Sequence, residues 1–106
     1  MGRESFLAAM RRWLAGFHRG SGHPVAGLGP DEMRSIALPA LIVPGNDLTH
    51  PGAAGRAAHR LLRNSEYREL MGEDQPVDVD LLGWEKKNGT LAATFIDFLR
   101  RRERAS

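Results

Sequence analysis

Residues 38–51 decide the fold of this chain, and they read Leu38-Pro39-Ala40-Leu41-Ile42-Val43-Pro44-Gly45-Asn46-Asp47-Leu48-Thr49-His50-Pro51. The segment opens with a short apolar run, Ala40–Val43, whose length and Ile-Val pair predict a strand buried on both faces. Polar residues follow at once, and a helical pattern starts after Pro51. Open α/β sheets place their ligand-handling residues at such strand ends. Asp47 is therefore the first candidate functional residue.

The residues after this segment predict a strand-helix-strand unit. An apolar stripe with an arginine-rich opposite side predicts a helix over residues 52–64, with Pro51 at its first position. A second strand is expected at Tyr67–Met71. Two strands joined by one helix form a parallel pair. The expected class is therefore α/β, a short parallel strand pair with flanking helices.

The N-terminal residues predict an amphipathic helix at 5–17, followed by a loop rich in Gly and Pro at 18–30. We expect the apolar stripe of this helix to pack on the body of the protein. An arginine-rich amphipathic N-terminus also fits a transit peptide or a membrane-surface helix. His18 and His23 lie in the loop without a third ligand at metal-site spacing, so we expect no metal there.

The C-terminal third combines two patterns. Val77, Val79 and Leu81 alternate with Asp78 and Asp80, which predicts extended chain over residues 72–88 with one wet face. The two acids could instead form an acid–base pair or bind a cation. A last helix is expected from near Thr90, with arginines gathered in its final turns where they suit the helix dipole.

Composition limits the function classes. The 106 residues contain no cysteine, which excludes disulfides, thiolate metal sites and a cysteine nucleophile. Net charge is +2 and no apolar run reaches membrane-span length, so we expect neither a nucleic-acid nor a membrane partner. No motif indicates a cofactor. We expect a single small domain, 1–106, located in the cytoplasm.

Residues 39–51, followed by an Ala-rich helix, resemble the penultimate strand and acid turn of the α/β-hydrolase family. In that family the turn often carries the acid of a Ser–Asp–His triad four residues before a proline, and Asp47 and Pro51 match this spacing. The elements over residues 36–102 resemble the family's last helices and strand. The resemblance implies an α/β-hydrolase-like fold, C-terminal portion only, with Asp47 as triad acid and His50 lining the substrate pocket.

The chain departs from the family pattern at two positions. The family order is nucleophile, acid, then His, which places the nucleophile upstream of this chain. The turn after the last expected strand reads Gly72-Glu73-Asp74-Gln75-Pro76, and no His follows His59. The chain therefore looks like a fragment, a gene remnant or a separately encoded half.

Two function classes follow. In the first, the chain is part of a serine-type hydrolase acting on an ester, amide or related carbonyl compound, and is not catalytic alone. Its partner would be an N-terminal hydrolase half or a second copy. In the second, it is a degenerate hydrolase, a pseudoenzyme, that serves as a small α/β binding or interaction module. The missing His favours the second class, and a Gly-x-Ser-x-Gly elbow encoded upstream would favour the first.

Overall fold

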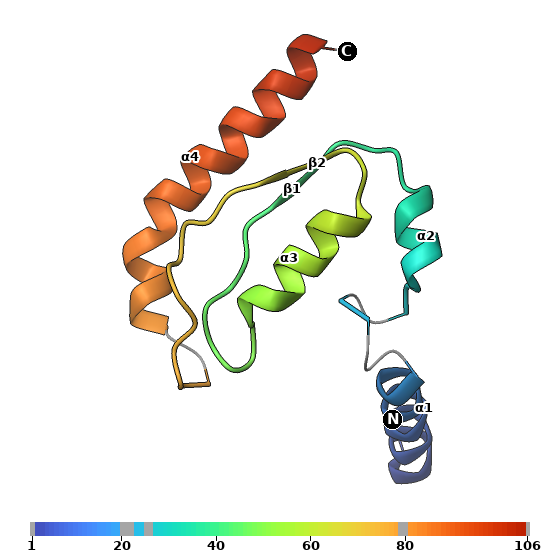
Figure 1. The fold of residues 1–106 in the computed structure, drawn as a ribbon. Coiled ribbons are helices and arrows are strands. Elements are labelled where there is room, and N and C mark those ends of the chain that lie inside the picture. Colours follow the sequence, from blue (N-terminus) through green and yellow to red (C-terminus); the bar gives the residue numbers. More distant parts are fainter. Residues whose placement is uncertain (1, 20–22, 25–26, 79–80, 106) are drawn as a thin grey trace.

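The computed structural model describes residues 2–19, 23–24, 27–78 and 81–105. Its elements, in chain order, are α1 (Arg3–Arg19), α2 (Pro30–Ser35), β1 (Ala40–Ile42), α3 (Gly52–Leu61), β2 (Ser65–Tyr67) and α4 (Leu81–Ala105). Figure 1 shows α1 at one side of the molecule and α4 at the other, with the strands and α3 between them.

The two strands form a parallel pair, as predicted, in which Ala40, Leu41 and Ile42 face Ser65, Glu66 and Tyr67. The ladder extends by one hydrogen bond at each end, from Ala40 N to Asn64 O and from Arg68 N to Ile42 O. The second strand was expected at Tyr67–Met71 and lies earlier. It starts early because α3 ends at Leu61 and the Ser65 hydroxyl donates to the Leu62 carbonyl 2.7 Å away.

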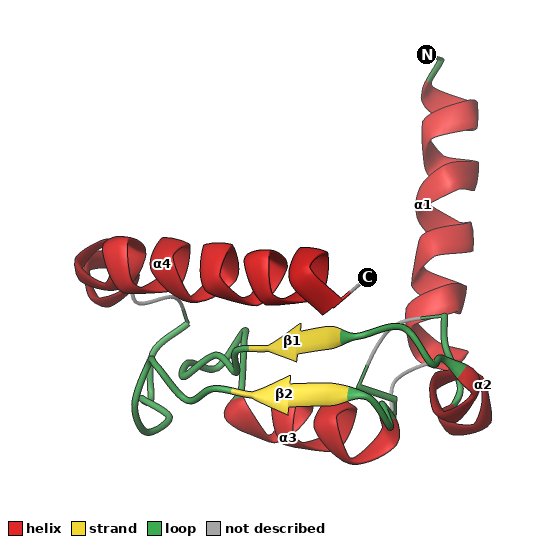
Figure 2. Cartoon of the chain, turned by 90° about the horizontal axis from the view of Figure 1, so that it is seen from above, coloured by secondary structure: helices red, strands yellow, loops and turns green. Residues whose placement is uncertain are grey.

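Helices cover both faces of the strand pair. In Figure 2, α3 lies on one side of the strands and α4 on the other, which gives three layers. The α3 helix approaches closely because Gly55 has no side chain: a Cβ there would lie 2.8 Å from the Cβ of Pro44. The mixed α/β class is confirmed, with a sheet of two strands among the described residues.

An ion pair holds α4 against β2. The Arg101 guanidinium donates to both carboxylate oxygens of Glu66, and Arg102 adds a longer contact at 3.4 Å. The hydrogen bond from Arg101 lowers the pKa of Glu66 below its ordinary value, and the same contact raises the pKa of Arg101. The pairing joins a strand centre to the last turns of a helix that follows much later in the chain.

The prediction of extended chain over residues 72–88 is wrong for the second half of that range. The α4 helix starts at Leu81, well before Thr90. Three apolar residues of this helix are spaced seven positions apart and therefore share one face: Trp84, Leu91 and Phe98. All three are buried or half-buried. This helical spacing outweighs the short alternation that ends at Leu81. Val79 and Asp80 lie outside the described residues.

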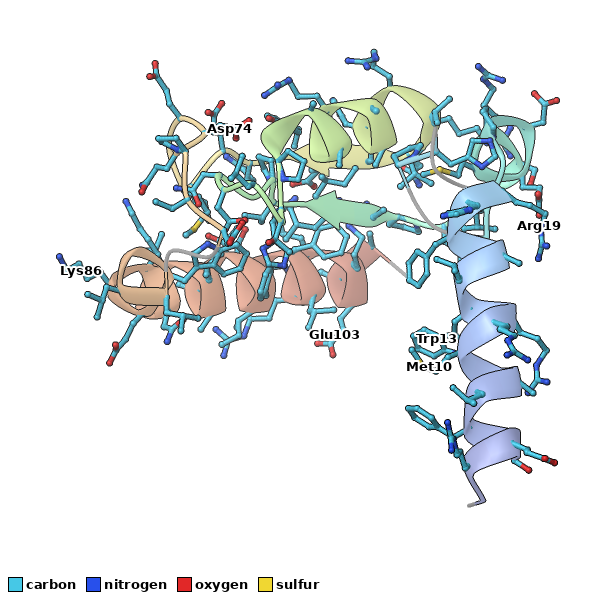
Figure 3. All side chains as sticks on the ribbon, turned by 90° about the horizontal axis from the view of Figure 1, so that it is seen from below. Met10, Trp13, Arg19, Asp74, Lys86 and Glu103 are labelled. Carbon is cyan, nitrogen blue, oxygen red and sulfur yellow. The ribbon has the colours of Figure 1, made fainter. Side chains whose placement is uncertain are left out.

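The apolar stripe of α1 does not pack on the body, contrary to expectation. None of its described residues is buried, and its large apolar side chains are about half exposed or more: Phe6, Met10, Trp13, Leu14 and Phe17. Figure 3 shows Met10 and Trp13 projecting from α1 into open space. The amphipathic pattern correctly indicates that an apolar face exists, but it contains no information on what covers that face.

The core is small for the length of the chain. Among the described residues, the buried apolar side chains are those of Met33, Met71 and Leu91, together with Pro44 beside the acid turn. The radius of gyration is 16.7 Å, whereas a compact domain of this length has about 13 Å. No helix in the described ranges is both long and apolar enough to cross a bilayer.

Candidate functional site

The candidate site is the turn that follows β1. Asp47 lies there, at the carboxyl end of the parallel strand, and is only 1% exposed. The turn folds back tightly, because a Cβ on Gly45 would lie 2.5 Å from the Cβ of His50 and closer still to the His50 carbonyl oxygen. Only glycine fits at position 45. The sequence placed Asp47 in this turn correctly.

Three hydrogen bonds join Asp47 to His50. The Asp47 carboxylate oxygen Oδ1 accepts the His50 backbone N–H at 2.6 Å. The same oxygen lies 3.1 Å from the His50 ring nitrogen Nδ1, and the Asp47 backbone N–H donates to the His50 carbonyl at 3.3 Å. The acid therefore holds both the backbone and the imidazole of the residue three positions later. Sequence reasoning placed both residues at this strand end but did not pair them.

Residues 71–78 run beside the turn and are bonded to it. The backbone N–H of Gln75 donates to Asn46 O at 2.7 Å, that of Leu48 to Val77 O at 2.7 Å, and that of Thr49 to Asp78 O at 3.2 Å. The backbone of this segment therefore borders the turn that carries Asp47.

Asn46 anchors the turn from inside. It is 2% exposed, and its side-chain amide donates to the Met71 carbonyl at 2.8 Å. Its Oδ1 is buried without a hydrogen bond among the described residues. Asn46 was not predicted to matter, although a buried polar side chain beside an acid is a recognisable signal once burial is known.

Asp74 caps α3. Its carboxylate accepts the Gly52 N–H at 3.0 Å, where the positive end of the helix dipole favours a negative charge. Pro51 was expected at the first helical position and is instead the N-cap residue. This long-range cap ties residues 71–78 to the start of α3.

The His50 side chain is half exposed. Its ring lies 5.7 Å from the ring of Trp84, at the start of α4, with an interplanar angle of 52°. A hollow of about 180 Å³ beside the turn is lined by residues that include Pro44, Gly45, Arg56 and Asp74. His50 is not among its lining residues, so the expected contact of His50 with a substrate pocket stays a prediction.

The other histidines take no part in this site. His59 has its Nδ1 2.7 Å from the Ser65 hydroxyl and its ring 5.4 Å from that of Tyr67. His23 lies near Gly29 in the loop before α2. In the part of the chain that the structure describes, no three His, Cys, Asp or Glu side chains gather to hold a metal.

Comparisons with known proteins identify no relative: no family model, curated protein or solved structure matches this chain. The relationship to α/β hydrolases therefore stays a prediction from the sequence.

Proposed function

We propose that the chain is the acid-carrying, C-terminal part of an α/β-hydrolase-like protein that cleaves an ester, amide or related carbonyl compound. The observation that carries the proposal is Asp47, a buried carboxylate in the turn after a parallel strand, hydrogen-bonded to an imidazole nitrogen. The three-layer arrangement around β1 is compatible with such a fold.

The role of Asp47 follows from its contacts. A buried carboxylate that accepts a hydrogen bond from an imidazole holds the ring in one orientation and stabilises its charged form. The same carboxylate also accepts a backbone amide, which stabilises the turn. Both contacts use the same oxygen, Oδ1, so the turn that Asp47 stabilises also carries the imidazole that it orients.

The purified chain should not hydrolyse esters alone. No serine hydroxyl of the described residues makes a hydrogen bond to His50, and acyl transfer needs a positioned nucleophile. We expect no turnover of p-nitrophenyl butyrate above the buffer rate. Turnover that disappears in Asp47→Asn would mean that this chain carries a nucleophile of its own.

The decisive experiment expresses the chain together with the polypeptide encoded immediately upstream. We expect a serine that reacts with a fluorophosphonate probe, and ester hydrolysis whose kcat falls by about 10⁴-fold in Asp47→Asn. Asp97→Asn is the matched control, because Asp97 is an exposed carboxylate on α4 paired with Arg101. The absence of a reactive serine, or equal activity of the two variants, would refute the proposal.

The second function, a small interaction module, is favoured by the exposed stripe of α1. Such a module would bind a partner through this stripe and need no nucleophile. It would give normal partner binding in Asp47→Asn and weakened binding in Trp13→Glu. If the chain is instead part of a hydrolase, Asp47→Asn should lower its activity and Trp13→Glu should leave the activity unchanged.

A further inference from the structure

The acid turn carries its own imidazole. In the family that the sequence resembles, the base lies after the last strand, but residues 68–78 contain no histidine. That segment contributes backbone hydrogen bonds to the turn. His50, three residues after the acid, contacts the Asp47 carboxylate with both its backbone N–H and its ring nitrogen Nδ1.

We propose that His50 is the proton-accepting imidazole of this site, with Asp47 as its orienting acid. The identity of the nucleophile, a serine hydroxyl, rests on the proposed function; the pairing of Asp47 with His50 does not. The sequence suggested only that His50 lines a pocket, so the geometry assigns it a different role.

The hydrogen bonds determine which ring nitrogen carries the proton. Asp47 Oδ1 already accepts the His50 backbone N–H at 2.6 Å, so this oxygen acts as an acceptor. The second group on the same oxygen, His50 Nδ1 at 3.1 Å, must then bring its own hydrogen. A neutral imidazole protonated on Nδ1 has its lone pair on Nε2. His50 therefore presents a base at Nε2.

The surroundings of the ring suit this role. The His50 side chain is half exposed, whereas that of its acid is fully buried. Within the described ranges, Nε2 makes no hydrogen bond, so it is available to an incoming hydroxyl. The Trp84 ring lies 5.7 Å away and is tilted by 52° to the imidazole, so an aromatic side chain borders one side of the base.

The proton transfer balances with three reactants: the serine hydroxyl, the substrate carbonyl and one water. As the serine oxygen adds to the substrate carbonyl carbon, its O–H bond breaks and the proton moves to His50 Nε2. The carbonyl π pair moves onto the carbonyl oxygen. When the carbon–leaving-group bond breaks, the pair on the oxygen re-forms the carbonyl, the leaving group takes the proton from Nε2, and His50 returns to its neutral form with the serine acylated. Water then adds to the acyl carbon in the same way: its proton moves to His50 Nε2 and from there to the departing serine oxygen as the acid is released. Asp47 stays ionised throughout and stabilises the imidazolium.

The first test measures the His50 tautomer in the full chain by long-range ¹H–¹⁵N NMR at a pH where the ring is neutral. We expect hydrogen on Nδ1 and none on Nε2. Asp47→Asn should raise the share of the other tautomer, because an amide can donate to Nδ1. His59, bonded to Ser65, is the internal control and should not change. A wild-type ring protonated on Nε2 would overturn the proposal without any variant.

The second test uses the active protein formed with the upstream polypeptide and compares His50→Gln with His59→Gln. We expect kcat to fall by roughly 10²–10⁴-fold in His50→Gln, with KM nearly unchanged, as for loss of a general base. His59→Gln should keep wild-type kinetics. A rise in KM at unchanged kcat would show that His50 only lines the pocket, and would overturn the proposal.

The two tests separate the two proposals. Loss of activity in Asp47→Asn but not in His50→Gln would keep the hydrolase assignment and reject His50 as base. A protonated Nδ1 that depends on Asp47, in a chain whose upstream region encodes no reactive serine, would support the acid–imidazole pair and reject the hydrolase.

Discussion

Removing the Asn46 side chain tests whether the acid turn is held from inside. In Asn46→Ala the Met71 carbonyl loses a 2.8 Å hydrogen bond in a site where the asparagine is 2% exposed. A buried polar group left without its partner costs about 1–3 kcal/mol of unfolding free energy. The variant also removes Asn46 Oδ1, which is buried without a hydrogen bond among the described residues, so part of this cost is offset.

We therefore expect Asn46→Ala to lower the unfolding free energy by about 1–2 kcal/mol, at the lower end of the range for an orphaned buried group. For a domain of roughly this length, that loss lowers Tm by roughly 4–10 °C. Thermal and urea melts followed by circular dichroism measure both quantities.

Asn64→Ala is the matched control. Asn64 makes the same kind of bond, from its amide to the Ala37 carbonyl at 3.1 Å, but in an exposed position. Water replaces that bond, so its loss should change the unfolding free energy by less than about 0.5 kcal/mol. Equal effects of the two substitutions would refute the reasoning, because they would show that burial of the Asn46 bond adds nothing to stability.

Three further outcomes follow from the same structure. Gly45→Ala should lower the unfolding free energy by about 1–3 kcal/mol, measured by thermal melts, and abolish the Nδ1 tautomer of His50, measured by NMR. Gly89→Ala is the control: a Cβ there meets no atom within 4 Å, so the substitution should stabilise α4. Glu66→Gln should destabilise the chain at pH 7. The pKa of Glu66 is lowered from 4.5 by the Arg101 hydrogen bond, so its contribution is complete above about pH 4.5 and is lost as pH falls through the lower, folded-state pKa. The difference in unfolding free energy between wild type and Glu66→Gln should therefore shrink in acid. A difference that stays constant with pH would contradict this prediction. Sedimentation across a concentration series should show weak self-association that Trp13→Glu reduces and Arg11→Glu, on the opposite face of α1, does not.

Local signals explain why the centre of the chain could be predicted. Two prolines bound the apolar run at Ala40–Val43, and the polar turn and helix follow within ten residues. These short-range features specify a strand, a turn and a helix in that order, which is enough to infer a parallel pair with Asp47 at its carboxyl end.

Long-range features explain the errors. The early start of α4 depends on Trp84, Leu91 and Phe98 packing against the body, and a pattern of alternation over five residues does not contain that contact. Likewise, helical spacing identifies the stripe of α1 but not its partner surface. The contact between Asp47 and His50 was missed for another reason: a turn-stabilising aspartate and an imidazole-orienting one have the same sequence pattern.

The pair formed by Asp47 and His50 closes over three residues, and this locality affects how the chain can be rearranged. Closing so short a loop costs little conformational entropy compared with joining distant segments. Both side chains move with the same turn, so a shift of α3 or α4 leaves their relative positions almost unchanged. New termini placed in the loop between α1 and α2, with the old ends joined by a flexible linker, should therefore preserve the pair. A triad assembled from three separate loops does not tolerate rearrangement in this way, because each connection contributes to its geometry.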